Sequence, residues 1–357
     1  MCVWAFFSAC SAPALSPDLA DAEAAEAAGD NQRALVHYDA ALRSCAAETN
    51  PTARRRMCAS AHVGRAELLD RIGEKARAAR AYARIARVLP GHLEASSTGV
   101  YRAGRLYLEL GDARTAYSLL WRAVTDYPDQ GYAADALRVL LRDGRQRNPR
   151  ELYRVMGDLL QPLSRTGVAD NLLYAIADLA ENENGDQRAA LGFYDKITVE
   201  YPGSGLRDDA FWHAARLARV LGDGPGAARR LRQLLATREV AFGAGSYNSI
   251  WFDNAQLELG RILRDDLDDP WGAVAAFARL PRDYPASVLI DDALWETAST
   301  WDRVGDRQKT CTALARLSAW PDSKYEIELA PALRNKRGCP CQLPTRSPYA
   351  HSRGFCR

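Results

Sequence analysis

The sequence predicts an all-α protein built from about eight antiparallel helix pairs. Ala, Leu, Arg, Asp and Glu are abundant among the 357 residues, and this composition favours helices. No long stretch alternates apolar and polar residues with the period of two that half-buried strands need. Small, bulky and turn-forming residues instead recur together along the chain, as in repeats with a period of about 34 residues. Such repeats stack one by one, so chain length does not set the number of domains.

The stretch Ser97–Gly131 shows the repeated pattern most clearly. Gly104 and Ala116 are small residues at which two helices would approach each other closely, and large residues between them have helical spacing. Gly111 breaks the chain between the helices, and Pro128 ends the second one. The stretch resembles a tetratricopeptide repeat (TPR) unit, and the resemblance implies a TPR-like right-handed superhelix. It does not define a function, because TPR arrays bind many different partners.

Turn glycines place the other pairs in order along residues 15–330, at Gly29, Gly73, Gly185, Gly222 and Gly305. The pair within 253–285 has a longer turn, RDDLDDPW, in which Pro270 is placed to open the second helix. The repeat is weak near 133–166, where the usual small contact residues are missing. Gly144 and Pro149 are interpreted as a turn there, with Pro149 near the start of the second helix. The glycine-rich segment near 240–249 is expected to be a loop.

The two ends of the chain differ from the repeats. Residues 331–357 are basic and contain Pro and Cys, and we expect a weakly ordered tail there. Residues 1–14 contain a short apolar segment followed by Ser-Ala-Cys10. This resembles a remnant of the lipobox of bacterial lipoproteins, which implies lipidation of Cys10. Phe7 in place of the usual Leu and the absence of a preceding Lys or Arg depart from that pattern, and a frayed apolar terminus is the alternative.

Two joints between helix pairs share one pattern, YPGS…DDAFW in 201–212 and YPAS…DDALW in 284–295. Pro would end one helix, and an Asp near the start of the next would cap free N–H groups and favour the helix dipole. This joint resembles those of bacterial envelope TPR lipoproteins, such as the outer-membrane β-barrel assembly lipoprotein and the Tol–Pal-associated cell-division coordinator. The resemblance implies a protein on the periplasmic face of an outer membrane.

Eight cysteines crowd toward the two ends of the chain. Cys45 and Cys58 would meet across the short connection between two antiparallel helices, so we predict a disulfide between them. Cys311 with Cys339 or Cys341 is a second, weaker candidate. Free thiols at these positions would favour a cytoplasmic protein instead.

No catalytic or cofactor motif is present. The sequence lacks HExxH, GxSxG and a P-loop, so we expect no enzyme activity, no cofactor and no metal. A net charge of +2 gives no overall attraction to nucleic acid, and nucleic acid is not an expected partner.

The predicted partner site is the face of the first helices, where an aromatic residue is repeatedly followed one turn later by Arg. Arg can hold carboxylates in a fixed geometry and Trp offers a rigid apolar surface, so we expect a protein or peptide partner with acidic groups. An alternative is that the tryptophans lie in the core and the arginines are only solvated. The candidate residues are Tyr101, Arg105, Trp212, Arg216, Arg219, Arg261, Arg264, Trp295 and Arg303.

These observations together predict a non-enzymatic protein–protein interaction scaffold. The expected setting is the cell envelope, with a lipid anchor on the outer membrane and a role in envelope assembly or cell division. A cytoplasmic TPR adaptor in signalling or regulation is the alternative.

Overall fold

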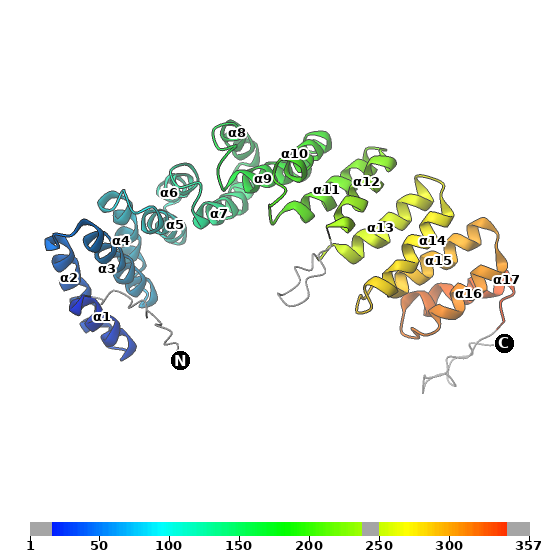
Figure 1. Cartoon of the computed structure of the whole chain (residues 1–357), viewed down its shortest axis with the longest axis horizontal. Coiled ribbons are helices and arrows are strands. Elements are labelled where there is room, and N and C mark those ends of the chain that lie inside the picture. Colours follow the sequence, from blue (N-terminus) through cyan, green and yellow to red (C-terminus); the bar gives the residue numbers. More distant parts are fainter. Residues whose placement is uncertain (1–15, 238–249, 341–357) are drawn as a thin grey trace, which may run out of the picture. The chain divides into compact units, whose positions relative to one another are not determined.

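The computed structural model describes residues 16–237 and 250–340, and all regular structure in these two stretches is helical (Figure 1). The predicted all-α fold is therefore confirmed. Cys10 and the segment near 240–249 lie outside the described residues. The helices are α1 (Pro17–Ala27), α2 (Asn31–Ala47), α3 (Pro51–Arg71), α4 (Lys75–Val88), α5 (Leu93–Glu109), α6 (Ala113–Thr125), α7 (Gly131–Arg147), α8 (Pro149–Leu159), α9 (Ala169–Asn182), α10 (Gln187–Glu200), α11 (Arg207–Val220), α12 (Gly224–Ala236), α13 (Phe252–Asp265), α14 (Pro270–Asp283), α15 (Ile290–Val304), α16 (Arg307–Leu317), the π-helical turn η1 (Tyr325–Leu329) and α17 (Ala330–Arg337).

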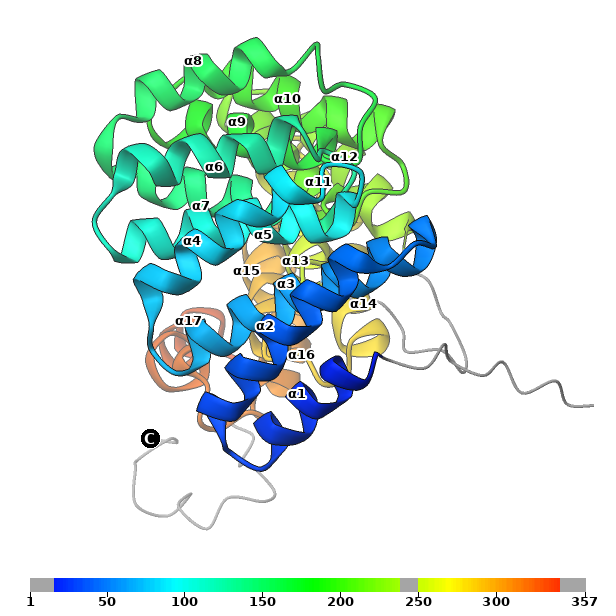
Figure 2. The same ribbon diagram turned by 90° about the vertical axis from the view of Figure 1, so that its left-hand side faces the viewer.

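Consecutive helices pack against each other as TPR-like pairs, such as α1 with α2 and α5 with α6 in the first half of the chain and α11 with α12 and α15 with α16 in the second. Neighbouring pairs within a unit also pack on each other; α4 lies against α5, for example, and α14 lies against α15. The chain divides into two compact units, residues 1–175 and 176–357. Figure 2 gives a second view of the helices of unit 1.

The small residues of the repeat lie where helices approach each other closely. A Cβ atom at Gly104 of α5 would lie 2.8 Å from Leu120 Cγ of α6. A Cβ atom at Gly260 of α13 would lie 2.3 Å from a ring carbon of Phe277 on α14. Leu120 and Phe277 are buried, so neither side chain has free space into which it could withdraw.

The turn within most pairs combines a left-handed glycine with an aspartate that caps the second helix. Gly222 has φ = +82°, a conformation that side chains disfavour, and it ends α11. The next residue, Asp223, accepts a hydrogen bond from the backbone N–H of Gly226 and so begins α12. The longer α13–α14 turn has Asp268 in the left-handed position, with φ = 49°, and Asp269 as the cap of α14. Asp268 therefore replaces the usual turn glycine.

The interpretation of Gly144 as a turn residue was wrong. Gly144 lies inside α7 and is buried, and a Cβ atom there would lie 2.9 Å from Leu152 Cδ2 of α8. It is thus the small contact residue that we expected to be missing from this pair. The turn is at Asn148, whose side chain caps α8, and Pro149 is the first residue of that helix, as predicted.

Two disulfides join neighbouring helices. Cys45 at the end of α2 is bonded to Cys58 in α3, with 5.2 Å between their Cα atoms. Cys311 in α16 is bonded to Cys339, just after α17, with a Cα–Cα distance of 5.3 Å. Of the two partners considered for Cys311, Cys341 lies outside the described residues.

The segment expected to be a weakly ordered tail begins instead with a docked helix. Arg334 of α17 donates hydrogen bonds of 2.7 and 2.6 Å to the buried carboxylate of Glu326 in η1. Lys336 and Arg337 both contact the carboxylate of Asp302 in α15. The basic residues here pair with acidic residues of the preceding helices, and composition alone did not reveal those partners.

Among the described residues, no helix is both long enough and apolar enough to cross a membrane. Nor does this part of the chain bring three or more His, Cys, Asp or Glu side chains together as possible metal ligands.

Candidate protein-binding surfaces

Most of the predicted partner-site residues lie on the first helices of unit 2, namely α11, α13 and α15. We call their shared side the α11–α13–α15 face; it carries Trp212, Arg216, Arg219, Arg261, Arg264, Trp295 and Arg303. Trp212 and Trp295 are half-buried, while Arg216 and Arg303 are exposed. The other two predicted residues, Tyr101 and Arg105, lie on α5 in unit 1.

The aromatic residues of this pattern stack on the next repeat. The rings of Trp212 and Trp251 are stacked with centroids 5.0 Å apart, and Trp295 stacks on Tyr325 at 5.6 Å. In unit 1, Tyr101 stacks on Tyr132 of the following helix pair at 4.8 Å. Stacked pairs of this kind stabilise by about 0.5–1.5 kcal/mol beyond the area that they bury. The recurring aromatic residue therefore joins one repeat to the next.

Most arginines on the α11–α13–α15 face are paired with carboxylates of the same face. Arg219 of α11 lies 2.6 Å from Glu258 of α13 and 2.7 Å from Asp266. Arg261 of α13 lies 2.7 Å from Glu296 of α15.

Two further arginines of this face are paired in the same way. Arg264 also donates a hydrogen bond to Glu296, and Arg303 donates one to Asp265. The hydrogen bond from Arg264 lowers the pKa of Asp265 to about 2. The face is a network of opposite charges that crosses from repeat to repeat.

The arginine pattern alone suggested free donors for a partner's carboxylates, and for these four arginines the geometry does not support that. Their acidic partners were missed because most stand on the neighbouring repeat, as Glu258 does for Arg219 and Glu296 for Arg261, 39 and 35 residues away. The spacing of three between Glu258 and Arg261 could have revealed only the weaker contact of 3.7 Å within α13. Arg216 differs, because it is exposed and has no ion pair among the described residues. Arg105 has only a 4.0 Å contact with Glu109 on its own helix.

The sequence predicted that the aspartates of the shared joint cap α11 and α15, and this prediction was wrong. Neither helix has a side-chain cap, and the carboxylates bond to the next repeat instead. Asp209 accepts a 2.6 Å hydrogen bond from Trp251 Nε1, and Asp292 accepts one of 2.5 Å from the hydroxyl of Tyr325. The serine of the second joint also links two repeats: the hydroxyl of Ser287 donates a hydrogen bond to Asp253 of the preceding repeat.

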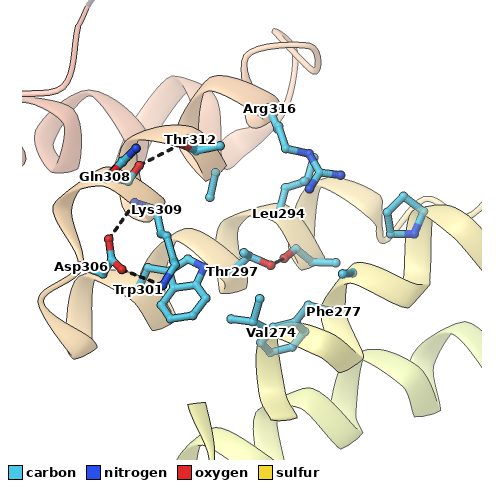
Figure 3. Close-up of a pocket in the computed structure, with 14 residues that line it drawn as sticks. Val274, Phe277, Leu294, Thr297, Trp301, Asp306, Gln308, Lys309, Thr312 and Arg316 are labelled. Atoms are coloured by element: carbon cyan, nitrogen blue, oxygen red, sulfur yellow. Dashed lines mark hydrogen bonds and ion pairs between the residues drawn. The ribbon is translucent and has the colours of Figure 1, made fainter. Parts of the chain in front are cut away.

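A pocket that the sequence did not predict lies between α14 and α16, over α15 (Figure 3). We call it the α14–α16 pocket; its volume is about 450 Å³. Val274, Phe277 and Leu294 form an apolar floor, and the side chains of Gln308, Thr312 and Arg316 stand around it in Figure 3. The pocket is large enough for a bulky side chain, and its mixture of apolar floor and polar edge is typical of ligand sites.

Trp301 and Lys309 line one end of the α14–α16 pocket, and Trp271 packs against both of them from outside the lining. The ring of Trp301 in the pocket meets Trp271 edge to face, with centroids 4.6 Å apart. Lys309 Nζ lies 4.1 Å from the ring centroid of Trp271 and 4.4 Å from that of Trp301. Asp306 lies 2.9 Å from the same ammonium group. Trp271 is the second residue of α14 and is 61% exposed. It therefore adds a large apolar surface beside the pocket.

The solved structures similar to this chain resemble it only distantly. No protein-family model matches the chain, and no curated protein matches it. The MamA protein is 13% identical with a TM-score of 0.42, over 55% of this chain and 96% of that one. PilW, described as a type IV pilus biogenesis factor, is 16% identical with a TM-score of 0.41, over 68% and 98%. A tetratricopeptide repeat protein from Parabacteroides merdae is 16% identical with a TM-score of 0.34, over 78% and 97%.

Proposed function

We propose that this chain is a non-enzymatic scaffold that binds other proteins, with the α14–α16 pocket as its principal anchor site. The observation that carries the proposal is the exposed Trp271 beside a pocket with an apolar floor. Tryptophan and arginine are enriched among residues that dominate protein–protein binding energy, especially beside pockets that exclude water. The pocket lining also includes Arg316, which is exposed and has no ion pair among the described residues.

The chemistry of the pocket favours one class of partner segment. A bulky apolar side chain would fill the space above Phe277 and Leu294. An acidic neighbour in the same segment would meet Arg316, because the charge of Lys309 is already shared with Asp306. The proposed ligand is therefore a segment of a partner protein in which a large apolar residue stands next to an Asp or Glu.

The α11–α13–α15 face is a second candidate surface in this scaffold. Its paired arginines hold the repeats together, so a partner's carboxylate would have to compete with Glu258 or Glu296 for them. Arg216 and the outer edge of Trp212 remain available on α11. Contact with a partner on this face would depend on Arg216 more than on Arg219, Arg261 or Arg264.

Site-specific crosslinking in the native host tests the anchor site. A photo-crosslinking residue replaces Thr312 in the pocket, and the captured partner is then compared between variants of the full chain. We expect Trp271→Ala and Arg316→Glu each to reduce capture several-fold, while circular dichroism shows an unchanged helix content. The matched control is Arg232→Glu, which makes the same charge change at an exposed position of α12, outside the pocket.

Equal capture by Arg316→Glu and Arg232→Glu would contradict the pocket as the anchor site. The variant Arg216→Glu separates the two surfaces. If it alone abolishes capture, the partner binds the α11–α13–α15 face and the pocket has another role.

We also propose that the scaffold works in the cell envelope, serving envelope assembly or division from the periplasmic face of the outer membrane. Two disulfides, Cys45–Cys58 and Cys311–Cys339, support an oxidising compartment, because such bonds are rare in the cytosol. Lipidation of Cys10 remains part of this proposal. Fractionation with a fatty-acid label tests it, and mass spectrometry of the non-reduced protein tests the bonds. An unlabelled cytosolic protein with free thiols would support the cytoplasmic adaptor instead.

A further inference from the structure

A second pocket, in unit 1, is lined mainly by basic side chains. It lies between α2 and α4, over α3, and has a volume of about 340 Å³; we call it the α2–α4 pocket. The order of these three helices can be followed in Figure 2. The lining residues that bear or can bear charge are Asp39 on α2, His62 and Arg65 on α3, and Arg77, Arg80 and Arg84 on α4.

Helical spacing concentrates the charge on one side of α4. Arg77, Arg80 and Arg84 stand three and four residues apart, so their side chains share one face of the helix. With His62 neutral, four arginines and one aspartate give the pocket a net formal charge of +3. Placing like charges together costs free energy unless an anion offsets it.

The protein itself supplies little of that compensation. The single carboxylate of the pocket, on Asp39, is taken by Arg65 at 2.7 Å. Arg77 has a contact of 3.7 Å with Glu74, and both side chains are about half exposed, so this pair contributes little. Within the described residues, neither Arg80 nor Arg84 has a carboxylate within 4.0 Å. By contrast, Arg230 in unit 2 has an acidic partner within 2.5 Å.

The side chain of His62 shows the effect of these charges on a titratable group. Burial, Arg84 and Arg65 together lower the pKa of His62 below its ordinary value. The groups that face it from the neighbouring helices are Asp39 of α2 and the arginines of α3 and α4. An anion between the arginines would reverse part of this effect and favour a protonated His62.

We propose that the α2–α4 pocket binds a phosphate group, held by Arg80 and Arg84 with Arg77 beside them. Guanidinium groups match the oxygens of phosphate in a bidentate geometry, and a dianion offsets more of the excess charge than one carboxylate does. The volume of 340 Å³ exceeds the need of a bare ion, since one water takes about 30 Å³. The pocket therefore has room for the organic part of a phosphorylated small molecule or of a lipid headgroup.

Calorimetric titration of the full chain with inorganic phosphate tests the site. We expect saturable binding that weakens at high salt and becomes at least tenfold weaker in the double variant Arg80→Gln/Arg84→Gln. The matched control, Arg54→Gln/Arg55→Gln, removes the same charge from exposed positions at the start of α3, outside the pocket. It should bind like the unaltered protein. Absence of saturable binding, or an equal loss in both double variants, would overturn the proposal.

Sulfate provides an independent test, because it keeps both negative charges across neutral and mildly acidic pH. Its affinity should rise as the pH falls below about 6.5, the usual pKa of histidine, because the bound anion favours protonation of His62, whose pKa is lowered in the free pocket. The variant His62→Gln should lose this pH dependence; if it keeps the full dependence, the pocket is not the site.

Vesicles of phosphatidylcholine with phosphatidic acid then identify the source of the phosphate. Binding that is lost in Arg80→Gln/Arg84→Gln indicates a headgroup, whereas binding of free phosphate alone indicates a soluble ligand.

Discussion

Replacing Glu296 with Gln should destabilise unit 2 far more than its place on a helix surface suggests. The residue is 9% exposed and bridges two arginines of α13, Arg261 at 2.7 Å and Arg264. Gln keeps the volume and one acceptor oxygen but removes the charge. Arg261 and Arg264 would then lose the ion pair with residue 296 and keep at most a weaker hydrogen bond to a neutral amide, although both side chains are largely buried.

The size of the effect follows from these contacts. A hydrogen bond to a charged group contributes about 1.5–3 kcal/mol, and breaking a buried ion pair costs about 3–5 kcal/mol. Arg261 is 31% exposed, so solvent screens part of its interaction, and Arg264 is only 12% exposed. We therefore expect Glu296→Gln to cost about 2–3 kcal/mol. The control Glu200→Gln breaks the exposed pair with Lys196 inside one helix and should cost less than about 0.5 kcal/mol.

Hydrogen exchange is the appropriate assay, because a repeat array need not unfold in one step. The amides of α15 to α17 should lose protection at lower denaturant concentration in Glu296→Gln, while those of α11 keep theirs. An effect of Glu296→Gln no larger than that of Glu200→Gln would refute the view that this charge network joins the repeats.

Three further predictions concern single features of the fold. Asp268→Gly should raise stability by about 0.5–1 kcal/mol because it relieves a left-handed residue, and Gly222→Ala should lower it by about 1 kcal/mol in thermal melts. The depressed pKa of Asp265 contributes stability at pH values above about 4 that is lost as the pH falls toward 2; Asp265→Asn should flatten acid denaturation in this window. Replacing Cys45 and Cys58 with Ser opens a cross-link between residues 13 apart and should cost about 3 kcal/mol, measured as a lower melting temperature that reductant does not lower further.

The fold could be predicted from the sequence because the residues that define each helix pair lie close together along the chain. Turn glycines, capping aspartates and small contact residues act within one helix pair, so their spacing alone predicts the pairs. Gly144 shows the limit of this reasoning, because a glycine can serve a turn or a close contact and only the position of Leu152 decides between them.

The partner surfaces were less predictable, because pairing between repeats depends on residues more than thirty positions apart. Asp209 and Trp251 are separated by 42 residues, and Arg261 and Glu296 by 35. A one-helix pattern identifies the face on which such residues lie but not whether another repeat already satisfies them. The arginines were therefore placed on a common face while their acidic partners were missed.

Recurrence along the chain points to assembly more than to recognition. Some residues recur from one helix pair to another, such as the joint aspartates and the stacked aromatic residues. These residues contact the next repeat. A residue that occurs in one repeat alone is not part of this recurring contact between repeats. Trp271 is of this kind: it follows the irregular turn that contains Asp268, starts its helix beside Pro270 and is 61% exposed. Part of its ring packs on Trp301 and Lys309 of the next repeat, but the residue stays largely exposed, and an exposed apolar surface beside a pocket is typical of a contact with a partner.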